Sequence, residues 1–173
     1  ADFCGLNAIG DAMASITDAS ETNRYKIVCS GHFLFTLQTE LIHIEPFNGE
    51  GSIINGKNWI DVEGMGRDET VLSVELDPGQ TFTGGKTYSD FQPVMWNSNG
   101  RLSNMSIIGK NCRYSLHIDA VNTQKGNTSN FESLYLNFKG AQGMGGSAGN
   151  CIGTGMGVDQ VWNFGKMAQM HHR

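Results

Sequence analysis

The stretch NWIDVEGMGRDETVL, residues 58–72, contains the pattern that decides the fold. Its apolar residues Ile60 and Val62 alternate with polar ones, which is the period of a strand with one buried face. Two glycines then allow a sharp turn before a second strand, TVLSVEL, begins. Similar units recur downstream as LSNMSIIGKNCRYSLHID (102–119), FESLYLNFKG (131–140) and QVWNFG (160–165).

Each of the four units reaches a glycine, and the spacing of these glycines indicates a repeat. They are Gly64, Gly109, Gly140 and Gly165, separated by 45, 31 and 25 residues. A solenoid coil takes roughly 20 to 30 residues, and its strand units bury their apolar faces by stacking. The longest gap contains PGQTFTGGKTYSD, which we interpret as a loop inserted at residues 78–99. We therefore predict an all-β fold, a right-handed parallel β-helix of about five coils over residues 25–173. A β-sandwich is the alternative.

The first 24 residues differ from the rest of the chain. Leu6, Ile9, Met13 and Ile16 recur at spacings of three and four, which predicts an amphipathic helix that ends near Ala19. A polar connector follows, and the first strand is expected from Tyr25. A helix in front of a solenoid shields the apolar end of its first coil. Residues 1–24 are thus expected to form a short α-helical cap and its connector.

Composition excludes several classes of function. A length of 173 residues fits one domain, and a formal charge of -5 gives no basic surface for nucleic acid. No apolar run approaches the roughly 18 residues of a membrane span, so membrane insertion is not expected. The cysteines Cys4, Cys29, Cys112 and Cys151 form no CxxC pair, and buried free thiols are expected rather than disulfides or metal ligands. We expect no metal and no cofactor.

The segment at 58–72, together with NMSIIGKNCRYSLHID, resembles the first coils of pectate-lyase-like right-handed β-helix proteins, especially phage tailspikes and related tail appendages. The resemblance extends over roughly residues 6–165. It implies a homotrimeric virion protein that assembles with other virion proteins and recognises a bacterial surface polysaccharide. The location implied is the phage tail, or otherwise the extracellular space. Because β-helices also serve as enzymes, a polysaccharide lyase or glycoside hydrolase is the alternative, and a spacer or assembly module without a ligand is a third.

Candidate catalytic residues lie in CRYSLHIDAV. Strand alternation sends Leu116 to one face and His117 and Asp119 to the other, about 7 Å apart along the strand. If the apolar face is the core, an imidazole and a carboxylate stand together outside, where they suit a general base and its orienting partner. Arg113 belongs to the same row and is a candidate for substrate binding. A hydrogen-bonded surface row without catalysis explains the same pattern.

Candidate substrate-binding residues are assigned by position and by side-chain type. Sugars stack on aromatic rings, and long insertions on rigid scaffolds commonly carry function. The expected insertion contains Tyr88, Asp90 and Trp96, although Trp96 suits the core under a loop equally well. Glu132 opens a later strand and supplies another carboxylate. A glycosidase needs two carboxyl groups about 5 to 10 Å apart, a separation that a sequence does not show across coils.

Overall fold

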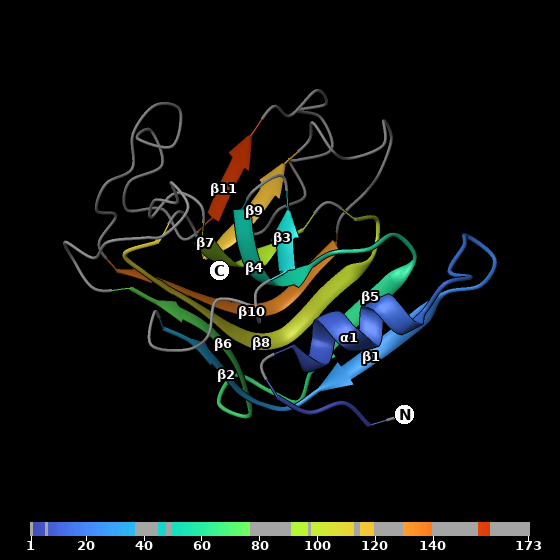
Figure 1. The fold of residues 1–173 in the computed structure, drawn as a ribbon, viewed down its shortest axis with the longest axis horizontal. Coiled ribbons are helices and arrows are strands. Elements are labelled where there is room, and N and C mark those ends of the chain that lie inside the picture. Colours follow the sequence, from blue (N-terminus) through green and yellow to red (C-terminus); the bar gives the residue numbers. More distant parts are fainter. Residues whose placement is uncertain are drawn as a thin grey trace.

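The computed structural model describes residues 2–5, 7–36, 45–47, 50–76, 91–96, 98–112, 115–119, 130–139 and 156–159, some of them by their backbone alone. The described part is mostly β-structure with parallel sheets and one short helix (Figure 1). Two sheets hold the strands. The chain visits them in alternation, and each return to a sheet runs parallel to the previous visit.

The first sheet consists of parallel pairs throughout. Its strands are β1 (Tyr25–Cys29), β2 (Gly31–Phe35), β5 (Ile60–Gly64), β6 (Thr70–Glu75), β8 (Arg101–Lys110) and β10 (Asn130–Lys139). The long strand β8 pairs with β5 along its first half and with β6 along its second half. On its other side β8 pairs with β10, where Arg101 faces Asn130 and Lys110 faces Lys139 at a constant offset of 29 residues. Strands from the sequence units at 58–72, 102–119 and 131–140 therefore lie side by side in this parallel sheet.

The second sheet contains β3 (Glu45–Phe47), β4 (Glu50–Asn55), β7 (Phe91–Met95), β9 (Leu116–Asp119) and β11 (Met156–Asp159). Strands β4, β7, β9 and β11 follow one another in parallel, and β3 pairs antiparallel with β4. The parallel pairs in both sheets are unlike the antiparallel hairpins that the alternative β-sandwich requires.

The core is built from columns of apolar side chains that stack from strand to strand. One column runs through Ile27, Val62, Leu102 and Phe131. A second runs through Phe33, Leu72, Ile107 and Leu136. In the second sheet, Ile54, Val94 and Leu116 form a third. The rings of Phe35 and Phe91 stack with centroids 5.8 Å apart and join the two sheets. Period-2 alternation produces these columns because every second side chain of a strand faces the core.

The first-sheet strands bend where the chain adopts left-handed backbone conformations. Asn104 has φ 57° in β8 and Ser133 has φ 52° in β10, and the two residues occupy equivalent positions. Gly64 lies at the same level of β5, and a Cβ atom added there would stand 2.2 Å from the carbonyl oxygen of Asn104. The repeat that we predicted from the glycine spacing is not the structural repeat. Gly109 pairs with Val74 and Phe138 rather than with Gly64.

Helix α1 (Ala8–Ser15) packs against β1 of the first sheet and β4 of the second (Figure 1). Its buried side chains are Ala8, Ile9, Ala12 and Met13. The predicted helix is present but shorter than expected. Ile16 has extended backbone angles and ends it. The Nζ atom of Lys57 donates hydrogen bonds to the carbonyl oxygens of Met13 and Ile16, which places a positive charge at the negative end of the helix dipole. With eight residues, α1 is too short to cross a membrane, and the described part contains no helix that does.

The insertion expected at residues 78–99 is not a single loop, because β7 lies inside it. All five residues of β7 are buried, so the strand has no polar face to reveal it by alternation. Pro93 lies in its centre and has no N–H to donate, which is unusual in a strand. The pairing of β7 with β4 omits this residue. Residues 77–90 lie outside the described part.

Candidate ligand-binding face

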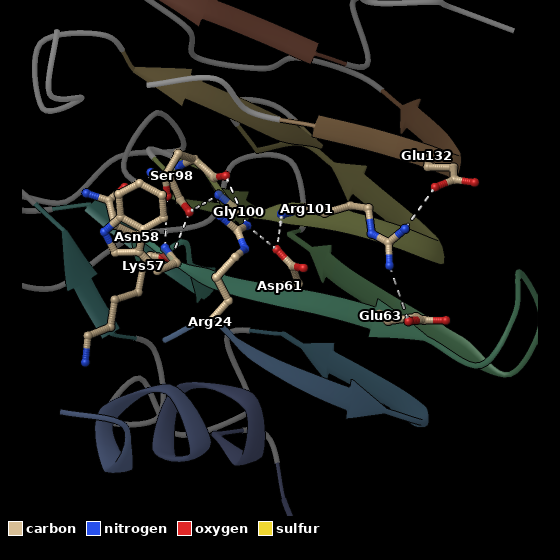
Figure 2. A network of polar contacts seen from close by, with 11 residues as sticks. Arg24, Lys57, Asn58, Asp61, Glu63, Ser98, Gly100, Arg101 and Glu132 are labelled. Atoms are coloured by element: carbon tan, nitrogen blue, oxygen red, sulfur yellow. Dashed lines mark hydrogen bonds and ion pairs between the residues drawn. The ribbon is translucent and has the colours of Figure 1, made fainter. Parts of the chain in front are cut away.

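A row of charged side chains crosses the outer face of the first sheet. We call it the charge row and define it as Lys26 of β1, Glu63 of β5, Arg101 of β8 and Glu132 of β10; Figure 2 shows the last three. Lys26 Nζ lies 2.8 Å from Glu63 Oε2, and the Arg101 guanidinium lies 3.8 Å from Glu63 and 3.3 Å from Glu132. The side chains point outward because Ile60 and Val62 of β5 take the inward positions.

The charge row holds Glu63 in its ionised form. The hydrogen bond and the positive charge of Lys26 lower the pKa of Glu63, and Arg101 and Asn104 lower it further against the opposing effect of partial burial. Asn104 contributes through its side-chain amide, which donates to Glu63 Oε1 at 3.5 Å. Glu63 is therefore a carboxylate acceptor near neutral pH.

Ser103 lies beneath the charge row. It is in register with Glu63 on one side and Glu132 on the other, so its side chain shares their outward direction. Yet Ser103 is 1% exposed, and its hydroxyl has no hydrogen-bond partner in the described structure. The same register places the Cα atoms of the two glutamates two strand spacings apart, about 9.6 Å. A pair of carboxylates thus flanks one guanidinium over a covered hydroxyl group.

One end of the charge row is fixed by a pair of stacked turns. Asp61 accepts hydrogen bonds from the Arg24 guanidinium at 2.9 Å and from the backbone N–H of Arg101 at 2.8 Å. Ser98 Oγ donates to the carbonyl oxygen of Lys57 and accepts from the N–H of Gly100, each at 2.8 Å (Figure 2). The bonds that Asp61 and Ser98 make to the backbone join the turn before β5 to the turn before β8 and fix where Arg101 begins its strand, whereas the Arg24 guanidinium pairs with the Asp61 carboxylate.

A five-residue loop, residues 65–69, projects between β5 and β6 and has no counterpart in β8. Its backbone is anchored to β8, because Gly66 N–H donates to the Asn104 carbonyl at 3.0 Å and the Ser106 hydroxyl donates to the Arg67 carbonyl at 2.6 Å. The guanidinium of Arg67 lies over the ring of Tyr135 on β10, with its carbon 3.9 Å from the ring centroid.

The 65–69 loop and Tyr135 of β10 bring exposed apolar, cationic and aromatic groups together. Met65 is 62% exposed and Tyr135 is 39% exposed. Arg24 and Arg101 each contact a carboxylate, but Arg67 has no carboxylate partner within the part of the chain that the structure describes. Asp68 and Glu69, the acidic residues of the loop, are both exposed.

Of the predicted catalytic pair, His117 is not at the surface. His117 is 1% exposed, and its neighbours Ser115 and Leu116 are also buried, so the expected outer position of His117 is wrong. The alternation was correct, but both faces of β9 are covered at these residues, as they are in β7. Asp119 lies in β9 opposite Asp159, and the structure describes its backbone only. The catalytic roles of these residues stay predictions.

The predicted binding residues separate into three groups. Glu132 is exposed and belongs to the charge row. Trp96 is fully buried in the core, which fits the alternative of a core residue and not a sugar-stacking platform, and its indole N–H has no partner in the described structure. Tyr88, Asp90 and Arg113 lie outside the described residues.

Sequence reasoning missed Lys26, Glu63, Arg101, Arg67 and Tyr135 as site residues. Strand alternation alone was enough to place Glu63 outside. The other members needed the strand register, since Arg67 and Tyr135 are far apart in the sequence and meet only through the pairing of β8 with β10.

The described residues contain no other well-formed candidate site. No group of three or more histidine, cysteine, aspartate or glutamate side chains among them gathers to hold a metal ion. Cys29 and Cys112 are buried thiols and Cys4 is an exposed one. A groove of about 440 Å³ lies between α1 and strands β1 and β2 and has a mixed lining that includes Phe3, Ile9 and Lys26.

Comparison with known proteins adds no assignment. No protein-family model matches the chain, and neither does any curated protein or any solved structure.

Proposed function

We propose that this chain is a right-handed parallel β-helix segment of a phage tailspike or tail appendage that recognises a bacterial surface polysaccharide. The strand register supports the β-helix, because parallel strands recur in two sheets and the offset between β8 and β10 is constant. Helix α1 packs against β1 and β4, as a capping helix would. The resemblance of the 58–72 stretch to tailspike coils supports the virion assignment. Homotrimer formation and contacts with other virion proteins belong to the same proposal.

The observation that carries the proposal is the charge row. It crosses four strands on an outer face, about 14 Å at three strand spacings, which suits an extended ligand better than a single small molecule. Its carboxylates accept and its guanidinium and ammonium groups donate, so sugar hydroxyl groups find both kinds of partner. Because the side chains already hold one another by ion pairs, little side-chain entropy is lost when a glycan binds.

The test is binding to a panel of purified capsular and O-antigen polysaccharides, measured by biolayer interferometry. We expect at least one to bind the chain, and Arg101→Gln to weaken that binding about tenfold, because it removes the only group that contacts both glutamates among the described residues. Arg24→Gln is the matched control, since Arg24 pairs with Asp61 outside the charge row. Sedimentation velocity tests the trimer independently. A monomer that binds no polysaccharide would leave the spacer module as the remaining function.

A second candidate function is glycoside hydrolysis by Glu63 and Glu132. Both carboxylates contact the Arg101 guanidinium, at 3.8 Å and 3.3 Å, and inverting enzymes hold two carboxyl groups roughly 6.5–9.5 Å apart. In that reaction one of the two groups takes a proton from a water molecule as the water attacks the anomeric carbon, and the other gives a proton to the leaving oxygen as the glycosidic bond breaks.

Product analysis separates this enzyme from the binding protein. Hydrolysis releases reducing ends, and we expect Glu63→Gln or Glu132→Gln to abolish their release. A lyase would instead produce unsaturated ends, and loss of those ends in His117→Ala or Asp119→Ala would support the pair predicted from sequence. Binding without any change in polysaccharide length would exclude both reactions for the polysaccharides tested.

A further inference from the structure

We infer that Arg67 and Tyr135 form a carboxylate-binding subsite, so that the polysaccharide recognised is an acidic one; this inference rests on the proposed function. The subsite lies on the 65–69 loop and β10, next to the charge row but separate from it. No residue of the subsite takes part in the ion pairs of the row.

The first argument is the state of the Arg67 guanidinium. Arg24 and Arg101 are neutralised by carboxylates, whereas Arg67 meets none among the described residues and is exposed. A guanidinium that lies on an aromatic ring keeps the N–H groups at its edge available, and these match the two oxygens of a carboxylate. The Arg67 guanidinium is therefore available to bind an anion, and the described part of the chain does not provide one.

The second argument is that the loop is held before any ligand arrives. The hydroxyl of Thr70 donates to the carbonyl oxygen of Cys29 at 2.7 Å and accepts from the N–H of Met65 at 2.9 Å. The Arg67 carbonyl accepts from Ser106 of β8, and the Asp68 carbonyl lies 3.2 Å from Nε2 of His32. Both ends and the centre of the loop are thus bonded to neighbouring strands, which lowers the entropy lost on binding.

The third argument concerns the kind of anion. Asp68 and Glu69 follow Arg67 in the same loop and repel a dense array of negative charges. A polymer with one carboxylate per repeat, separated by neutral sugars, avoids this repulsion. The exposed Met65 and the exposed part of the Tyr135 ring provide apolar surface for the C–H face of a neighbouring sugar. These features favour a glycan with isolated sugar carboxylates.

The probe is a bacterial capsular polysaccharide of alternating glucuronate and N-acetylhexosamine, compared with the same polymer after reduction of its carboxyl groups to alcohols. We expect the native polymer to bind about tenfold more tightly than the reduced one, and increasing salt to weaken only the native complex. Arg67→Gln should remove that preference without affecting the reduced polymer. Arg67→Lys should restore only part of it, because lysine keeps the charge but loses the planar fork.

Arg24→Gln is the matched control, since Arg24 also lies over an aromatic ring, that of Trp59, but is neutralised by Asp61. It should leave the preference unchanged. Equal binding of native and reduced polymers, or a preference that survives Arg67→Gln, would overturn the subsite while leaving glycan recognition by the charge row intact. Equally tight, Arg67-dependent binding of dextran sulfate would overturn the carboxylate assignment. Failure of every polysaccharide to bind would overturn the proposed function itself.

Discussion

Strand β5 of the first sheet and strands β7 and β9 of the second differ in the exposure of their polar residues. In β5, Asp61 and Glu63 are partly exposed on the outer face, and Glu63 belongs to the charge row, while the apolar residues face the core. In the second sheet, polar residues such as Gln92 and His117 are buried together with the apolar residues beside them. Polar alternation therefore indicates exposure only where one face of a sheet is open to solvent. The following predictions test this contrast, from the largest effect to the smallest.

Removing a buried side chain beside the second sheet should lower the free energy of unfolding far more than removing an exposed side chain of the first sheet. We expect Trp96→Ala to lower the free energy of unfolding by about 3–5 kcal/mol, because the indole is fully buried in the core. Glu132→Ala, which removes an exposed ion pair, should cost less than about 1 kcal/mol. Urea unfolding followed by tryptophan fluorescence and circular dichroism measures both. Similar costs for the two variants would contradict the contrast.

The bend of the first sheet depends on close backbone contact at Gly64. Gly64→Ala should destabilise the protein by about 3 kcal/mol, because the added Cβ would lie 2.2 Å from the Asn104 carbonyl oxygen. At Gly66 the space is open and only the strained backbone, φ 144°, opposes a side chain, so Gly66→Ala should cost about 1–2 kcal/mol. Thermal unfolding of the two variants provides the comparison. A Gly64 variant that is no less stable than the Gly66 variant would refute the bend as described.

The helix cap depends on a cation from the turn that precedes β5. Lys57→Met should lower stability by about 1 kcal/mol, because the carbonyl groups at the end of α1 lose their donor and the helix dipole loses its counter-charge. Hydrogen exchange should show the change in residues 8–15 first. Uniform loss of protection in both sheets, without a preferential effect on α1, would contradict this assignment.

The charge row should make the free energy of unfolding decrease at low pH. The pKa of Glu63 is lowered from its ordinary value of 4.5 in the folded state, so its stabilising effect is present above that value and is lost as the pH falls through the lower folded pKa. Lys26→Gln should raise the folded pKa and reduce this acid-dependent loss. Unfolding midpoints between pH 6 and pH 2.5 measure it, and an unchanged profile in the variant would show that Lys26 is not the main cause.

The same contrast explains what could be predicted from the sequence. The strand at Ile60 to Gly64, its polar face and the helix near Ile9 and Met13 follow from local periodicity, which needs no knowledge of neighbours. The burial of His117 could not be predicted in this way. The alternation of a single strand does not show whether other parts of the protein cover its polar face. The ion pair between Arg101 and Glu132 depends on the 29-residue offset between β8 and β10, which differs from the 31 residues between Gly109 and Gly140.

Cross-linking tests the stacking of β8 on β10 most directly. Ser103 and Glu132 are register partners, and neighbouring strands place their Cα atoms about 4.8 Å apart, within the range of a disulfide. In a Cys4→Ser background, we expect Ser103→Cys with Glu132→Cys to cross-link under mild oxidation. Ser106→Cys with Glu132→Cys, displaced by three residues or about 10 Å along the strands, should not. A cross-link in the displaced pair and none in the aligned pair would contradict the register on which the charge row depends.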